Sequence, residues 1–173
     1  IIPDNRIQDE ALDDIDLAFN FQVNNTESLS SILELPVVNY SPAKIFGDYS
    51  SIRDKFKFEA YVPAIKAAGM NIKSAYISAE NKKENISSKI TALVVGKKNV
   101  MNDIAINIDA ADNLINTNVV FSNDSRQKAK GVFDIATLLS KKDKDAPLRI
   151  DIDILPSELI LNIAIWVMNK SHI

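Results

Sequence analysis

Acidic side chains have the spacing that could most readily do chemistry in this sequence. They cluster as Asp13, Asp14 and Asp16 in "DDID", as Asp151 and Asp153 in "DIDI", and as Asp103, Asp109 and Asp112 between them. Clustered carboxylates could bind Ca²⁺, and a carboxylate pair could hydrolyse a glycosidic bond. Carboxylates two residues apart on an alternating strand, however, lie on its solvated side. With no EF-hand or repeated calcium motif beside them, we predict neither a metal site nor a glycosidase.

Other reactive groups are few. His172 is the single histidine and stands one residue from the end of the sequence, where little chain remains to orient it in a Ser-His-Asp triad. No cysteine is present, which excludes disulfides, thiol nucleophiles and thiolate metal sites. The four glycines form no phosphate-binding loop. We therefore predict a protein that is not an enzyme and has no cofactor.

Composition narrows the class further. The 173 residues are 46% hydrophobic and 25% charged, which is typical of a globular chain. The net charge of -3, with lysine and arginine spread along the sequence, disfavours nucleic acid as a partner. The longest apolar run, near the end, has roughly half the length of a membrane-spanning helix. Both ends look cut, and we interpret residues 1–173 as a single β-rich segment excised from a longer chain.

Period-two alternation is the dominant pattern, and it must position whatever site exists. Alternation of this kind puts one side of each strand against apolar matter and the other in water. Less regular strands are expected near 70–79, 86–96, 113–122, 127–135 and 158–168, joined by short polar turns. The apolar positions are Ile15, Leu17, Phe19, Phe21 and Val23 in "IDLAFNFQV", Phe56 and Phe58 in "KFKFEAYV", Ile104, Ile106 and Ile108 in "VMNDIAINIDA", and Ile150, Ile152 and Ile154 in "LRIDIDIL".

Two or three short helices are expected to interrupt the strands. "TESLSSILELP" places Thr26 as an N-cap, Glu27 in the first turn and Pro36 as the stop. "PAIKAAG" could form one helical turn closed by Gly69, and "FDIATLLSKKDK" could form a short helix, although its first half also suits a strand. The predicted fold is mostly β: an antiparallel meander, curled into a groove or closed as a sandwich.

The order of these elements resembles a known family. "SLSSILELPVVNYSPAKIFG", then "NTNVVFSNDSRQKAKGVFDIATLL", then "PSELILNIAIWVMNKSHI" is similar to the middle of the TamB proteins, translocation and assembly modules of the AsmA-like group in diderm bacteria. The closing pattern is carried by Leu161, Trp166, Ser171 and Ile173. Where the family usually has Asp-Thr before this tryptophan segment, the sequence has Ile163-Ala164.

The resemblance implies a "β-taco", a long sheet curled around an apolar concave side. It also implies a periplasmic protein anchored in the inner membrane, which conducts phospholipid between the two membranes or assists an outer-membrane assembly protein. The apolar positions named above would then line a lipid groove. The residues alone leave an alternative open, a closed β-sandwich that acts as a scaffold or binds carbohydrate with Trp166 as a stacking platform. Alternation defines two faces without saying which is concave.

Overall fold

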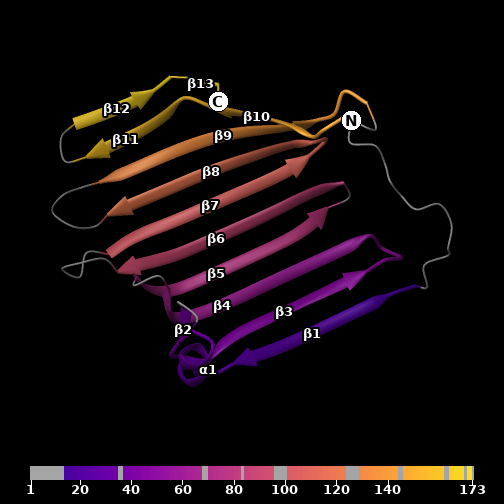
Figure 1. The fold of residues 1–173 in the computed structure, drawn as a ribbon, viewed down its shortest axis with the longest axis vertical. Coiled ribbons are helices and arrows are strands. Elements are labelled where there is room, and N and C mark those ends of the chain that lie inside the picture. Colours follow the sequence, from indigo (N-terminus) through magenta and orange to yellow (C-terminus); the bar gives the residue numbers. More distant parts are fainter. Residues whose placement is uncertain are drawn as a thin grey trace.

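The strands form one antiparallel sheet (Figure 1). The computed structural model describes residues 14–34, 37–67, 70–82, 84–95, 101–123, 129–143, 146–161, 164–169 and 171–172. Within them the sheet has 13 strands in the order β1-β3-β4-β5-β6-β7-β8-β9-β10-β13, with β2 beside β4, β11 beside β9, and β12 beside β11. The strands are β1 (Asp16–Val23), β2 (Val37–Asn39), β3 (Ala43–Ser50), β4 (Lys55–Ala67), β5 (Met70–Lys82), β6 (Asn85–Val95), β7 (Met101–Ala111), β8 (Leu114–Asn123), β9 (Lys130–Ser140), β10 (Arg149–Ile154), β11 (Ser157–Leu161), β12 (Ala164–Met168) and β13 (Ser171–His172).

The predicted mostly-β antiparallel meander is confirmed, because neighbouring strands follow chain order through most of the sheet. Local turn chemistry supports this order. Asp112 and Asn113 join β7 to β8 with positive φ values of 49° and 66°, which these two residue types tolerate well. One expected strand, at 158–168, is instead the antiparallel hairpin of β11 and β12. Strand β3 was not among the strands expected from alternation.

Two prolines, Pro42 and Pro156, lie in breaks between short strands that pair with the same neighbour. Strands β2 and β3 both pair with β4, and Ser41-Pro42 lies between them. Strands β10 and β11 both pair with β9, and Leu155-Pro156 lies between them. Because proline has no N–H to donate, it is tolerated in a strand mainly at an edge or a bulge. Each pair of short strands therefore acts as one longer strand with a bulge.

A register shift in β5 keeps the two faces of the sheet distinct. Ser74 has a positive φ of 50°, and the pairing of β5 with β6 shifts between Lys73 and Tyr76. The shift sets Ile72 opposite Val94, as Ile77 is set opposite Ile90. One inserted residue reverses the side on which every following side chain lies. The bulge therefore returns Ile72 to the same face as Ile77.

One helix lies in the described residues, α1 (Glu27–Ile32), at the first predicted position and beside β2. The N–H of Glu27, the first residue of the helix, donates a hydrogen bond of 2.7 Å to Asn25 Oδ1. Thr26 is at the predicted N-cap position, and its carbonyl accepts a hydrogen bond of 2.8 Å from the N–H of Ser30. Its hydroxyl accepts a hydrogen bond of 2.9 Å from the N–H of Asn39 rather than from the helix. No helix in the described part of the chain is long and apolar enough to cross a bilayer.

The other two segments expected to be helical are strands. Residues 63–67 belong to β4 and residues 133–140 to β9, while Gly69 and Lys144 lie outside the described residues. Each segment has a strand hydrogen-bonded on both sides, β2 and β5 for the first and β8 and β10 for the second. Pairing on both edges overrides a weak local helical preference, because tertiary context decides short ambiguous segments.

Few side chains in the described part of the molecule are fully buried. Among the described residues, Ala43 and Ala60 are the buried hydrophobic side chains. The accessible surface of the chain is 13027 Å², compared with about 8,400 Å² for a compact protein of this mass. No second sheet packs on the first in the part that the structure describes. The sheet is therefore a single layer with two open faces.

Candidate functional site: the apolar face of the sheet

Strand register gathers apolar side chains on one side of the sheet, which we call the apolar face. Directly paired residues in an antiparallel sheet point to the same side. One line of paired residues crosses eight strands, and we call it the apolar row: Phe21, Ile45, Ala60, Ile77, Ile90, Ile106, Val119 and Phe133. At about 4.8 Å between strands, the row is about 34 Å long and runs perpendicular to them.

The predicted groove residues all fall on this face. On β1 they are Leu17, Phe19, Phe21 and Val23, followed by Phe56 and Phe58 on β4, Ile104, Ile106 and Ile108 on β7, and Ile150, Ile152 and Ile154 on β10. Ile15 precedes β1 and extends the pairing of β1 with β3, since the Ile15 carbonyl accepts a hydrogen bond of 2.9 Å from the N–H of Ser51. The register thus brings four distant segments onto one surface. Whether that surface binds lipid stays a prediction.

The apolar face is open to solvent in the described structure. Near the β1 edge, Phe21 is 59% exposed, and Ile150 on β10 is 54% exposed. At the centre, Ile90 and Ile106 are half-buried by their neighbours within the sheet. No described side chain that the register of β1–β12 places on this face carries a charge. A ligand without charge or directional hydrogen bonds fits such a surface best.

Two phenylalanine–glycine pairs shape the apolar face. Phe19 is paired with Gly47, and a Cβ added there would lie 2.7 Å from Phe19 Cζ and 2.7 Å from the Lys57 carbonyl oxygen. Phe121 is paired with Gly131, where an added Cβ would overlap Phe121 Cε1. In both pairs the ring lies over the glycine. At Gly47 the Lys57 backbone also blocks a larger residue, whereas at Gly131 the Phe121 ring would have to move.

Phe121 and Phe133 were not among the predicted site residues. Their ring centroids are 6.2 Å apart and nearly parallel, at 13°, while those of Phe19 and Phe21 are 5.4 Å apart. The signal that could have found them is the alternation of Ile115, Val119 and Phe121 in β8. Thr117 interrupts that alternation and makes it less regular than in β1.

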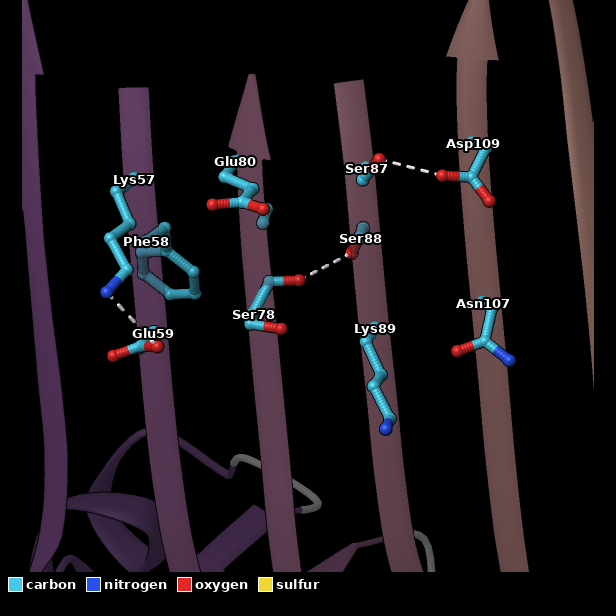
Figure 2. Close-up of a pocket in the computed structure, with 11 residues that line it drawn as sticks. Lys57, Phe58, Glu59, Ser78, Glu80, Ser87, Ser88, Lys89, Asn107 and Asp109 are labelled. Carbon is cyan, nitrogen blue, oxygen red and sulfur yellow. Dashed lines mark hydrogen bonds and ion pairs between the residues drawn. The ribbon is translucent and has the colours of Figure 1, made fainter. Parts of the chain in front are cut away.

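The opposite side of the sheet, the polar face, carries a shallow hollow of about 430 Å³ across β4–β7 (Figure 2). Its wall includes an ion pair between Lys57 Nζ and Glu59 Oε1, 3.5 Å apart. On the same wall, Ser87 Oγ donates a hydrogen bond of 2.7 Å to Asp109 Oδ1. This serine bonds a carboxylate and no histidine lines the hollow, so the hollow lacks a serine–histidine pair. Of the residues singled out from the sequence, Phe58 and Asp109 line the hollow.

The polar face is also divided by charge, which the sequence did not indicate. Over β3–β6 lysines outnumber carboxylates. The carboxylates there are Asp48, Glu59 and Glu80, and the lysines are Lys44, Lys55, Lys57, Lys66, Lys73 and Lys89. Over β7–β11 the polar face carries mainly carboxylates: Asp103, Asp109, Asp134, Asp151, Asp153 and Glu158. Lysines that are dispersed along the chain therefore share one face of four adjacent strands.

The acidic clusters are dispersed by the fold. Asp16 lies 3.6 Å from Arg53, and Asp151 lies 2.8 Å from Arg149. Asp112 is in the β7–β8 turn, whereas Asp103 and Asp109 are on the polar face. No three or more acidic or histidine side chains converge on a possible metal position within the described residues, and Asp13 lies outside them.

Trp166 lies in β12, paired with Leu159 on the apolar face, and is 61% exposed. His172 pairs with Asp153 through β13 and β10, while its side chain and Ile173 lie outside the described residues. Comparisons of this chain with protein-family models, with curated proteins and with solved structures find no match.

Proposed function

We propose that this chain is a non-enzymatic sheet segment whose apolar face carries the acyl chains of phospholipid. The observation that supports this most directly is the apolar row, which crosses eight strands without a charged or polar residue. No layer covers this row in the described structure. Contiguous apolar surface on a soluble protein usually marks a surface that something else covers.

Acyl chains match the row in length and chemistry. One leaflet of a bilayer has a hydrocarbon depth of about 15 Å, so the row of about 34 Å has room for two chains end to end. Burying one CH₂ is worth about 0.8 kcal/mol, so a whole chain gains several kcal/mol even after the cost of ordering it. Because the row runs across the strands, each further strand of the same pattern would lengthen it. That geometry suits movement along the sheet.

The wider setting is part of the same proposal. The order of elements resembles the TamB proteins, which supports a periplasmic position in an envelope-spanning protein anchored in the inner membrane. Lipid would then pass between inner and outer membranes along the apolar face. Support of an outer-membrane assembly protein is the second role that the resemblance implies.

The direct test is mass spectrometry of an organic extract from protein purified without detergent. We expect phospholipid at about one molecule per chain or more, because an uncovered row of this size would retain lipid from the cell. A stably folded protein whose extract contains no phospholipid or fatty acid would overturn the proposal.

Matched variants locate the lipid on one face. Ile106 lies in the apolar row, and Asn107, its neighbour in sequence, lies on the polar face. Ile106→Lys should lower lipid content at least tenfold, since it buries a charge against acyl chains, whereas Asn107→Lys should leave it unchanged. Circular dichroism checks folding. Phe21→Lys and Asn20→Lys repeat the comparison on β1, where side chains are more exposed. Equal lipid loss in both members of each pair would contradict the assignment.

The exposed Trp166 supports a second candidate, binding of carbohydrate or protein by this surface. A tryptophan that is 61% exposed can stack on a sugar ring. Glycan-array binding that Trp166→Ala abolishes would support it, and a parent protein that binds no glycan would remove it. Since the described strands form a single sheet, this candidate no longer needs a closed sandwich.

A further inference from the structure

Strand β12 is an open edge of the sheet. Among the described residues it pairs with β11 alone, so its outer N–H and C=O groups face away from the sheet. All five of its side chains are exposed, and Ile165, Trp166 and Val167 are 65%, 61% and 66% exposed. These exposed fractions are among the largest for hydrophobic residues of the molecule.

Both sides of β12 are apolar. Register places Ala164, Trp166 and Met168 on the apolar face, and Ile165 and Val167 on the polar face. Strands that are apolar on both sides are typical of positions covered on both sides. At the opposite edge, β1 has the ordinary one-sided pattern, with Asn20 and Gln22 on its polar face. The two edge strands thus differ, because β12 is apolar on both sides and β1 mainly on one.

The β12 edge also lacks the features that normally prevent strand addition. Between Ala164 and Met168 there is no charged residue, no proline and no bulge in the pairing with β11. Natural edge strands usually carry at least one of these. Such an edge accepts another strand by extending the backbone ladder.

We propose that β12 pairs with the β12 of a second copy of this chain, antiparallel, about a two-fold axis perpendicular to the sheet. In a two-fold contact each strand meets its own sequence, so any charged residue near the axis would meet the same charge. The uncharged β12 suits self-pairing for that reason. A perpendicular axis also keeps both apolar faces on one side of the joined sheet.

The joined sheet would extend an existing apolar line. Ala92, Ile104, Phe121, Gly131, Leu159 and Trp166 are paired in succession and reach the open edge. Trp166, at the centre of β12, would lie closest to the axis and be covered by its counterpart. The pairing requires only the edge and holds whether or not the apolar face binds lipid.

Sedimentation equilibrium of lipid-free protein across a concentration series is the first test. We expect a monomer–dimer equilibrium that Ile165→Lys with Val167→Lys weakens at least tenfold, since like charges then meet across the axis. Both side chains are mostly exposed, so the variant should fold. The matched control, Ala18→Lys with Asn20→Lys on the β1 edge, should dimerise like the parent. A parent that stays monomeric, or equal weakening by both variants, would overturn the proposal.

Disulfide trapping places the contact, because the chain has no cysteine of its own. Single-cysteine variants Ala164→Cys, Trp166→Cys and Met168→Cys, oxidised alone and in pairwise mixtures, should yield a covalent dimer for at least one combination. Ala18→Cys on β1 should not. A dimer by mass with no covalent product from any β12 combination would place the contact elsewhere, such as between two apolar faces, and would overturn the proposal.

Discussion

The two faces of this sheet share the same strands and backbone, yet they are stabilised differently. Directly behind the apolar row, one residue away on each strand, lies a mostly polar row: Asn20, Phe46, Glu59, Ser78, Lys89, Asn107, Asn118 and Asp134. Within this row Asn107 Nδ2 donates a hydrogen bond of 3.4 Å to Asn118 Oδ1, and Asn118 Nδ2 donates one of 2.7 Å to Asp134 Oδ1.

The two rows differ in how their side chains interact with water. The polar side chains of the mostly polar row are satisfied by one another and by water, so the row is stable in solvent as it stands. Apolar side chains stabilise a structure only when they are removed from water. The mostly polar row therefore needs no cover, whereas the apolar row gains free energy of stabilisation when a cover excludes water from it. The proposed acyl chains would be that cover.

The largest expected effect on stability is at Gly47. Gly47→Val should lower the free energy of unfolding by about 2–3 kcal/mol, because the new side chain meets both Phe19 and the Lys57 backbone. Asp48→Val, one residue away on the exposed polar side, should change it by about 0.5 kcal/mol or less. Urea unfolding followed by circular dichroism measures both. Equal effects would show that the two faces do not differ in packing.

A smaller effect is expected from truncation in the apolar row. Ile90 lies between Ile77 and Ile106 and is half-buried, so Ile90→Ala should cost about 1–2 kcal/mol, below the range for a fully buried side chain. Lys89→Ala on the polar face serves as the control and should be nearly neutral. If Ile90→Ala cost about 4 kcal/mol in lipid-free protein, the row would be covered by the chain itself.

The smallest expected effect on stability comes from removing a hydrogen bond in the polar row. Asn118→Ala removes the amide between Asn107 and Asp134 and should cost about 1 kcal/mol in thermal or urea unfolding. In the double variant with Asn107→Ala, the second change should add less than it does alone, because the two residues share one bond. Full additivity would mean that these side chains act independently.

Alternation predicted the strands well because it is a local property of the chain. The regular segments at β1, β4, β7 and β10 are strands with the expected apolar sides. The prediction failed where the pattern was weak. Residues 63–67 and 133–140 were considered for helices, the first half of the second also suiting a strand, and both are strands with a partner on each side. The strand expected at 158–168 turns back on itself.

The candidate site was predictable residue by residue but not as a surface. Each apolar position follows from its own strand, yet whether Phe21 and Phe133 share a line depends on seven successive registers. The β5 bulge at Ser74 illustrates the sensitivity, since without it Ile72 would lie on the polar face. No local pattern in the sequence predicted the bulge at Ser74.

What the sequence determined by itself is the two-sidedness of each strand, because side chains alternate every residue whatever the strand pairs with. Tertiary structure alone decided which strands are neighbours, how they are shifted, and where the sheet stays open. The lysines that gather over β3–β6 and the unprotected β12 edge both arise from that non-local pairing. Register is set by contacts between residues far apart in the chain, and a period of two cannot encode it.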